Sequence, residues 1–341
     1  MASLDIFKSD AFGVVELTAA LNKVPYTPNF LGNLGIFEPK PIRTLAVAIE
    51  KRDNVLALVP TSQRGAPLGQ RTNEKRDIRD FRTVRVAKGD RLTSDELQSI
   101  RAFGSETELM QVQDETMRRM MSIRRDIDLT HENMRLGAIQ GIVTDADGST
   151  IRNWFTEWGI AQPSEIDFDL DNASPVSGAV RKLCNQVVRS TARAAKGAWV
   201  DGQSQVYGLC GDAFWDDLTA HKEVRETYLN QLAAAELRTG NAFGSFNYGG
   251  ITFINYRGTD DGTTVAVGTD KVKFFPVGAP SVFQQAMSPG ESFDWVNTLG
   301  QPFYALTIPD DDRKAFIDIE VYSYPLYICT RPEMLQRGKR T

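Results

Sequence analysis

The chain has 341 residues, of which 41% are hydrophobic, so it can form two or three domains with at least one sizeable core. Its formal net charge of −5 excludes a generally basic nucleic-acid-binding protein. No stretch approaches the run of about 18 apolar residues that a membrane helix needs, and the N-terminus does not resemble a signal peptide, so we expect a soluble protein made in the cytoplasm.

Residues 1–42 predict a short helix, Val14 to Leu21, followed by an extended arm. The arm, VPYTPNFLGNLGIFEPKPI, contains four prolines and two glycines, which prevent long regular structure. Several of its side chains are too apolar for a solvated tail: Phe30, Leu31, Leu34, Ile36 and Phe37. The arm is therefore expected to lie either on its own body or on a neighbouring copy.

Residues 43–90 predict a long hairpin without a core of its own. Apolar and other residues alternate in RTLAVAIEKRDNVLALVP and in DFRTVRVAKGD, which is typical of strands. The polar, basic connection between them contains Gly65, Pro67 and Gly69. We expect its tip, Thr61 to Arg79, to become ordered only against a neighbour, because fixing each residue costs roughly 1–2 kcal/mol of backbone entropy.

The most informative element is a long amphipathic helix, predicted from Glu106 to Gln140. A short helix capped by Thr93 or Ser94 with Glu96 precedes it. Ser105 and Glu108 form a capping box, and Gly141 stands where a glycine would end the helix. Thirty-five residues would span roughly 50 Å, more than a small domain. The predicted buried stripe is Leu109, Val112, Thr116, Met120, Ile123, Ile127, His131, Met134 and Ala138.

The remaining sequence predicts a mixed body of helices and strands. A hairpin turns at Asp147-Gly148, a helix runs over 175–193 with Ser174 as its N-cap, and Asp212 caps a further helical region. Predicted strands lie in QVYGL, FGSFNYGGITFINYRG, KVKFFPVGA, PFYALTIPD and the final AFIDIEVYSYPLYICT. The chain is thus predicted to be an α+β protein.

No residue pattern supports catalysis, a cofactor or a metal. His131 lies on the apolar stripe and is expected in the core, whereas His221 is expected at the surface. Neither histidine has zinc-ligand spacing, and nucleophile-elbow and nucleotide-binding motifs are absent. The run Asp145-Ala146-Asp147-Gly148 lacks the later ligands of a calcium loop and is interpreted as a turn. Asp310, Asp311 and Asp312 are interpreted as a solvated connection rather than a magnesium site.

Cysteine use agrees with an intracellular product. The cysteines have no metal-binding spacing, and we expect reduced, buried thiols at Cys184, Cys210 and Cys329.

Charge is distributed unevenly along the chain. Residues 61–91 contain nine Lys or Arg against four Asp or Glu, while residues 144–171 contain seven Asp or Glu against one Arg. The two segments are interpreted either as complementary patches on neighbouring copies or as two solvated loops.

The order of these parts resembles the major capsid proteins of tailed bacteriophages, in the family typified by the major head protein of phage lambda. The resemblance rests on YTPNFLGNLGIF, the hairpin ending RTVRVAKGD, the long helix, FNYGGITFINYRG and the ending IEVYSYPLYICTRPEML. Together these stretches cover most of the chain.

The resemblance implies the Hong Kong 97-type capsid fold. It assigns 1–42 to the N-terminal arm, 43–90 to the E-loop, 91–171 to a P-domain with spine helix 106–140, 172–311 to an A-domain and 312–341 to a C-terminal strand returning to the P-domain. The spine helix is expected to pack through Met120, Ile123 and Ile127 against Val321 and the last strand. The lambda-like branch forms no covalent cross-link between subunits, and none is assigned here.

The same resemblance implies self-assembly into pentamers and hexamers of an icosahedral shell around double-stranded DNA. A scaffold, a decoration protein and a portal are the implied partners, with no membrane, and the protein is expected in the virion after assembly in the host cytoplasm. Alternatives are a tail-tube or portal subunit and, less favoured, an α/β enzyme. Expected contacts between subunits are Arg64, Arg71, Lys75, Arg76, Arg79, Phe30 and Leu31, with Asp145, Asp147, Glu157, Glu165 and Asp167 as acceptors and Asp114 and Glu115 competing.

Overall fold

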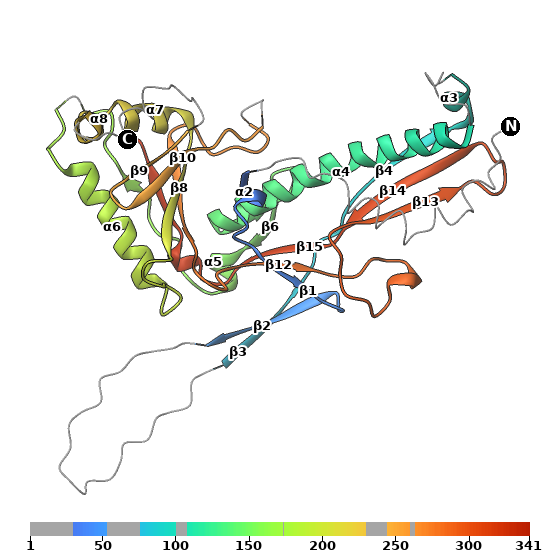
Figure 1. Ribbon diagram of the computed structural model, residues 1–341. Coiled ribbons are helices and arrows are strands. Elements are labelled where there is room, and N and C mark those ends of the chain that lie inside the picture. The colour runs from blue at the N-terminus through green and yellow to red at the C-terminus, as the bar shows by residue number, and fades with distance from the viewer. Residues whose placement is uncertain (1–29, 53–75, 100–107, 173, 230–243, 260–262) are drawn as a thin grey trace, which may run out of the picture.

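A computed structural model describes residues 30–52, 76–99, 108–172, 174–229, 244–259 and 263–341 (Figure 1). The molecule is elongated, with the long helix α4 (Glu108–Gln140) running between a helix-covered sheet at one end and a narrow sheet at the other (Figure 1). The predicted helix Val14 to Leu21, residues 61–75 of the hairpin tip and Ser105 of the capping box lie outside the described residues, whereas residues 76–79 of that tip lie in a strand.

Helix α4 ends where the sequence predicts. Gly141 has a φ of +83°, and its N–H bonds the Ala138 carbonyl over 3.2 Å, so the chain leaves the helix through the left-handed conformation that glycine tolerates. A side chain there would also collide with the ring of Phe155, 2.3 Å from an added Cβ. The predicted C-terminal glycine is therefore confirmed.

A three-stranded antiparallel sheet lies along α4, in the order β13 (Tyr304–Pro309), β14 (Phe316–Ser323) and β4 (Val86–Thr93). Burial alternates along β14, because successive side chains point to opposite faces of the sheet. Helix α3 (Ser94–Ser99) follows β4. The Thr93 hydroxyl accepts from the Glu96 N–H, and the Glu96 carboxylate accepts from the Thr93 N–H, so the predicted cap is a capping box on Thr93.

The predicted hairpin is present. Strands β2 (Ala46–Arg52) and β3 (Arg76–Arg82) pair antiparallel from Ala46 opposite Arg82 to Arg52 opposite Arg76. They form a separate two-stranded ribbon that extends away from the body (Figure 1). A ribbon of two strands has too little apolar surface for independent stability, in agreement with the prediction of a coreless hairpin.

The described part of the arm lies on its own subunit. Helix α2 (Phe30–Asn33) rests near α4, and β1 (Glu38–Pro41) pairs in parallel with β12 (Phe283–Met287), which pairs antiparallel with β15 (Pro325–Cys329). Two of the four residues of β1 are prolines, which an edge strand accommodates because one side of it needs no ladder hydrogen bonds.

The end of the molecule opposite β13 is built on a six-stranded sheet. Its order is β7 (Ile166–Asp167), β16 (Gln336–Lys339), β11 (Lys271–Val277), β8 (Gln205–Cys210), β10 (Ile251–Asn255) and β9 (Ser245–Tyr248). Helices α6 (Ala179–Ala194), α7 (Asp212–Ala220) and α8 (Lys222–Leu229) share one core with the face that carries Val206, Phe253 and Phe274. The other face, with Leu209 and Phe275, belongs to the core around the end of α4.

A small hairpin joins α4 to this sheet. Strands β5 (Ile142–Thr144) and β6 (Thr150–Asn153) pair antiparallel, and Gly148 has a φ of +81° in the turn, as Asp147-Gly148 predicts. Helix α5 (Trp154–Glu157) follows, with the Asn153 side chain accepting hydrogen bonds from Phe155 and Thr156 N–H groups. Two short 3-10 helices, η3 (Phe293–Trp295) and η4 (Pro332–Met334), complete the described elements.

Two helix predictions are wrong in detail. Helix α6 begins at Ala179 rather than 175, because the Glu223 carboxylate of α8 accepts the first N–H groups of the helix, those of Val180 and Arg181. The region after Asp212 is two helices rather than one, since His221 adopts an extended ψ of 133°. Asp212 is the first helical residue, and Gly211 occupies the N-cap.

The final predicted strand is also divided. Its residues form β14 and β15 in two different sheets, since the chain turns at Tyr324, whose ring packs in a separate cluster with Trp295 and Tyr304. Strand β16 then joins the six-stranded sheet rather than returning along α4. Conversely, β12 and β13 lie outside that sheet, although both fall within the predicted 172–311 unit.

Candidate functional site

The long helix is anchored through its apolar stripe. Met120, Ile123 and Ile127 are each at most 3% exposed and pack with the β14 side chains Ile317, Ile319 and Val321. Phe303, Ala305 and Leu92 complete this core. The predicted packing against Val321 is confirmed. The helix is thereby fixed along a narrow sheet and serves as a strut.

Ion pairs hold the outer half of α4. Glu115 is buried and accepts hydrogen bonds from Arg118 and Arg119 at 2.6 to 2.8 Å. These bonds, first those from Arg118, lower the pKa of Glu115 to about 2 despite its burial. Arg119 also reaches Asp90 and Glu96 at 3.3 and 3.1 Å. Glu115 is therefore engaged within its own subunit, which corrects the expectation that it accepts hydrogen bonds from a neighbour. Asp114 is exposed.

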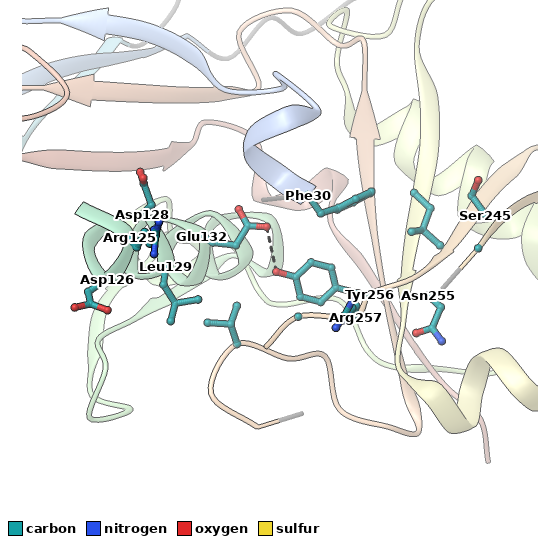
Figure 2. Close-up of a pocket in the computed structure, with 14 residues that line it drawn as sticks. Phe30, Arg125, Asp126, Asp128, Leu129, Glu132, Ser245, Asn255, Tyr256 and Arg257 are labelled. Carbon is teal, nitrogen blue, oxygen red and sulfur yellow. Dashed lines mark hydrogen bonds between the residues drawn. The ribbon is translucent and has the colours of Figure 1, made fainter. Parts of the chain in front are cut away.

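A buried carboxylate joins three segments at the other end of α4. Glu132 Oε1 accepts the Leu31 N–H at 2.9 Å and the Tyr256 hydroxyl at 3.1 Å, as Figure 2 shows for Tyr256. Arg135 lies 3.5 Å from the other carboxylate oxygen. Burial raises the pKa of Glu132, although these donors oppose the shift. The arm, the long helix and the end of β10 therefore meet on one side chain.

Both histidines are structural. His131 is buried and stacks on Phe303 with ring centroids 5.5 Å apart, as predicted for a core histidine. Burial, together with Arg135 and Arg124, lowers its pKa to about 3, so the ring stays neutral near pH 7. The prediction of a surface position for His221 is wrong, because His221 is only 6% exposed at the junction of α7 and α8.

A pocket of about 630 Å³ lies between α2, α4 and the end of β10 (Figure 2). Its walls combine Phe30, Leu129 and Ile254 with Asp126, Asp128 and Arg125. Burial raises the pKa of Asp128, and Arg124 is 3.5 Å away. Glu132 and Tyr256 also line the pocket, and their hydrogen bond places it beside the junction of α4 with the end of β10.

The base of the projecting ribbon is attached to α5. The Arg79 guanidinium donates a hydrogen bond to the Glu157 carbonyl, and Glu157 lies 3.6 Å from Arg152 of β6. Phe81 packs its ring against Trp154 and Trp158 with centroids 5.3 and 5.7 Å apart. The predicted partners Arg79 and Glu157 therefore contact one another within one chain.

The predicted acidic acceptors fall into two groups. Asp145 and Asp147 are exposed at the β5–β6 turn, where hydrogen bonds from Ser149 lower the pKa of Asp147. Glu165 and Asp167 are instead paired within the chain, with Lys271 and Lys339, at 3.0 Å in each case. Of these four predicted acceptors, Asp145 and Asp147 at the exposed turn are thus the two without an ion pair among the described residues.

The predicted contact residues of the arm and hairpin have different positions. Leu31 is 0% exposed, so its expected contact with a neighbour is wrong: burial against α4 uses this side chain within the subunit. Phe30 is half-buried and lies edge-on to Tyr256. Arg76 lies in β3, while Arg64, Arg71 and Lys75 lie outside the described residues.

Sequence reasoning missed two surfaces. The loop between β12 and β13 exposes Phe293 (94%), Val296 and Leu299 around the buried anchor Trp295. The outer face of α6 exposes four cations, Arg181, Lys182, Arg189 and Arg193, with the neutral Asn185 and Gln186 between them. The sequence did contain a signal for the basic surface of α6, because the cations of 181–193 recur without an intervening acidic residue.

The described residues include no group of three or more His, Cys, Asp or Glu side chains able to hold a metal ion. None of the helices in the described ranges is both long and apolar enough to cross a membrane. All three cysteines are free and buried, as predicted, and burial raises the pKa of Cys184 to about 12.

Comparison with known proteins identifies the family. The sequence profile of phage major capsid protein E matches residues 13–340. The major capsid protein of Salmonella phage Felix O1 is 27% identical, with 95% of each chain covered. The major capsid protein of Pseudomonas phage KPP10 is 24% identical, covering 96% of this chain and 97% of the relative.

Solved structures agree on the fold. The putative capsid protein of an E. coli CFT073 prophage is similar with a TM-score of 0.57 at 15% identity, covering 96% of this chain and 99% of that chain. A narrow sheet beneath a long helix, a projecting ribbon and a helix-covered sheet are together the architecture of a Hong Kong 97-type capsid subunit. The chain is a member of the phage major capsid protein E family and has this fold.

Proposed function

We propose that copies of this chain assemble as pentamers and hexamers into the icosahedral shell of a phage head that encloses double-stranded DNA. The observation that carries the proposal is the β2–β3 ribbon, which extends from the body without a core of its own. Two-stranded ribbons are marginally stable in isolation, so a neighbouring copy is the natural support. Membership of a capsid family makes that neighbour a second copy of the chain.

In this proposal each segment of the chain has the role that the family resemblance implies. Residues 1–42 form the arm and 43–90 the E-loop, both reaching adjacent subunits, while 91–171 form the P-domain around spine helix α4. Residues 172–311 supply the A-domain near the capsomer axis, with β12 and β13 leaving it, and 312–341 return towards α4 before β16. Arg64, Arg71, Lys75 and Arg76 would contact the exposed Asp145 and Asp147 of a neighbour.

The role is structural rather than catalytic. In the pocket beside α4, the Glu132 carboxylate is engaged by the Leu31 N–H and the Tyr256 hydroxyl, and His131 is held neutral in the core. A scaffold, a decoration protein and a portal at one vertex are further partners that we propose, with non-specific contact to packaged DNA. Assembly would take place in the host cytoplasm, and the mature location is the virion capsid.

Electron microscopy of the expressed protein in negative stain tests the proposal. Closed shells are the expected result, formed by the chain alone or with co-expressed phage head proteins. Tubes or rings would favour the alternative of a tail-tube or portal subunit. Small monodisperse particles at high protein concentration under both conditions would overturn the proposal.

A further inference from the structure

Helix α6 presents a basic outer face. Its 16 residues include four Lys or Arg and no Asp or Glu. Val180, Cys184, Val187 and Thr191 are buried on the sheet side. The four cations are all exposed on the other side: Arg181, Lys182, Arg189 and Arg193.

These cations have no ion-pair partner within the part of the chain that the structure describes. Lys196, just beyond the helix, differs because its ammonium lies 3.4 Å from Glu333. In a chain of net charge −5, a helix face with four unpaired cations is a local excess of positive charge. Such a face is expected to attract an anionic surface.

Helix α7 carries the opposite charge. Its nine residues include three Asp and no Lys or Arg. Asp217 is paired with Arg340 at 2.8 Å, whereas Asp212 and Asp216, one helical turn apart, are exposed. Phe214, Trp215 and Leu218 hold the opposite side of α7 against the sheet.

Helices α6 and α7 pack on the same sheet face. The first turn of α6 is bonded by Glu223 of α8, and the middle of α6 lies at the start of β8, whereas α7 lies at the end of β8. Cys184 of α6 lies against Gly249 and Val188 against Gly250, at the turn where β10 begins beside the start of β8. Helix α7 follows the end of β8, where the Gly211 N–H bonds the Lys271 carbonyl at 2.9 Å. The six residues of β8 separate the two ends by roughly 20 Å. In Figure 1, α7 lies across the end of β8, and α6 runs alongside the sheet.

We propose that the basic face of α6 in one copy docks on the Asp212–Asp216 face of α7 in the next copy. A contact between two different patches of one chain is head-to-tail, and such contacts generate a ring when the rotation between copies closes. This inference rests on the proposed function, which supplies the second copy. It adds the pair of helices through which adjacent copies would be held around a capsomer.

Exposed apolar residues that flank α6 in the sequence favour a protein partner over a nucleic-acid backbone. Val176 (73% exposed) precedes α6, and Val200 (36% exposed) lies beyond its C-terminal end. Interfaces between proteins combine apolar contact with a charged rim, whereas contacts to phosphates rely on charge and hydrogen bonds. Individual exposed ion pairs are weak, so the four cations are expected to act together.

A charge-exchange experiment tests the proposal in the full chain. The variants are Arg189→Glu with Arg193→Glu on α6, Asp212→Lys with Asp216→Lys on α7, and all four substitutions combined. Each double variant should reduce the yield of shells on the order of tenfold or more, and the combination should restore most of it. Arg313→Glu with Lys314→Glu, which changes the same charge at the exposed turn before β14, is the matched control and should leave the yield high.

The set of results distinguishes a failure of this inference from a failure of the proposed function. Wild-type shells together with normal shells from both double variants would overturn the inference and leave the function standing. Failure of the combined variant to recover, with circular dichroism showing a folded subunit, would also overturn it. Normal shells that retain less DNA in the α6 variant would assign the face to nucleic acid instead. Absence of wild-type shells would overturn function and inference together.

Discussion

Tyr256 donates a hydrogen bond from its hydroxyl to Glu132 Oε1 over 3.1 Å, which joins the end of β10 to the long helix. The same oxygen accepts the Leu31 N–H, so the arm is attached at this point as well. One buried carboxylate thus fixes the position of the six-stranded sheet relative to the strut on which it is mounted.

Removing the Tyr256 hydroxyl should weaken the junction. We expect Tyr256→Phe to lower the free energy of unfolding by about 1–2 kcal/mol, because a buried carboxylate loses a donor. Chemical denaturation of the unassembled subunit measures the change. Tyr207→Phe, on the same sheet but without a hydroxyl hydrogen bond to Glu132, serves as the control. Equal stability of Tyr256→Phe and the wild type would show that the bond contributes nothing.

The pH dependence of Glu132 has a defined sign. Its pKa is raised in the folded subunit, so its contribution to stability is present at low pH and is lost as the pH rises through that raised value. Glu132→Gln, which stays neutral, should therefore lose less stability than the wild type when the pH is raised above about 4.5. Parallel stability curves for the two proteins between about pH 4 and about pH 7 would contradict a raised pKa for Glu132.

The contribution of Glu115 to stability should depend on pH in the opposite direction. Arg118 and Arg119 lower its pKa to about 2, so its contribution is present above its ordinary value and is lost as the pH falls towards 2. Because the Arg118 side chain is 70% exposed, we expect a contribution of only about 1–2 kcal/mol near neutral pH. Thermal unfolding of Glu115→Gln across the acid range should show a flatter pH profile than the wild type. A profile as steep as that of the wild type would exclude this role.

The buried apolar face of α4 should not tolerate a charged side chain. Ile123→Asp is expected to cost about 3–5 kcal/mol, because a carboxylate would be buried between α4 and β14 without a partner. The variant should be insoluble or fail to form shells. Ser122→Asp, one position away on the exposed side of the helix, is the matched control and should behave as the wild type. Normal shells from Ile123→Asp would place that side chain in solvent.

Assembly should depend on the basic hairpin collectively. Reversal of Arg64, Arg71 and Arg76 to Glu should abolish or misdirect shells, whereas one reversal should only slow assembly, since exposed pairs contribute about 0–1 kcal/mol each. Light scattering during assembly provides the rate. Association should also weaken as salt exceeds ~0.1–0.2 M. Wild-type kinetics from the triple variant would mean that the basic residues are merely solvated.

Local signals predicted much of this fold. The three- and four-residue spacing of Met120, Ile123 and Ile127 identified the buried face of α4, Gly141 marked its end, and Thr93 with Glu96 marked the start of α3. These features depend on residues within one or two helical turns. Their physical causes are therefore contained in short stretches of sequence.

Long-range contacts could not be predicted in the same way. The start of α6 depends on Glu223, more than 40 residues away, and the junction at Glu132 depends on Tyr256 and Leu31. The division of the last predicted strand depends on the packing of Tyr324 against Trp295 and Tyr304. Only the folded chain brings these residues together, which is also why the complementary positions of α6 and α7 are not visible in the sequence.

A cryo-electron microscopy reconstruction of the assembled particle tests the central claim most directly. The account predicts an icosahedral shell in which the β2–β3 ribbon of each copy lies on an adjacent copy, with its basic residues near that copy's Asp145 and Asp147. A particle without icosahedral symmetry, or a shell in which each ribbon folds back onto its own subunit, would contradict it.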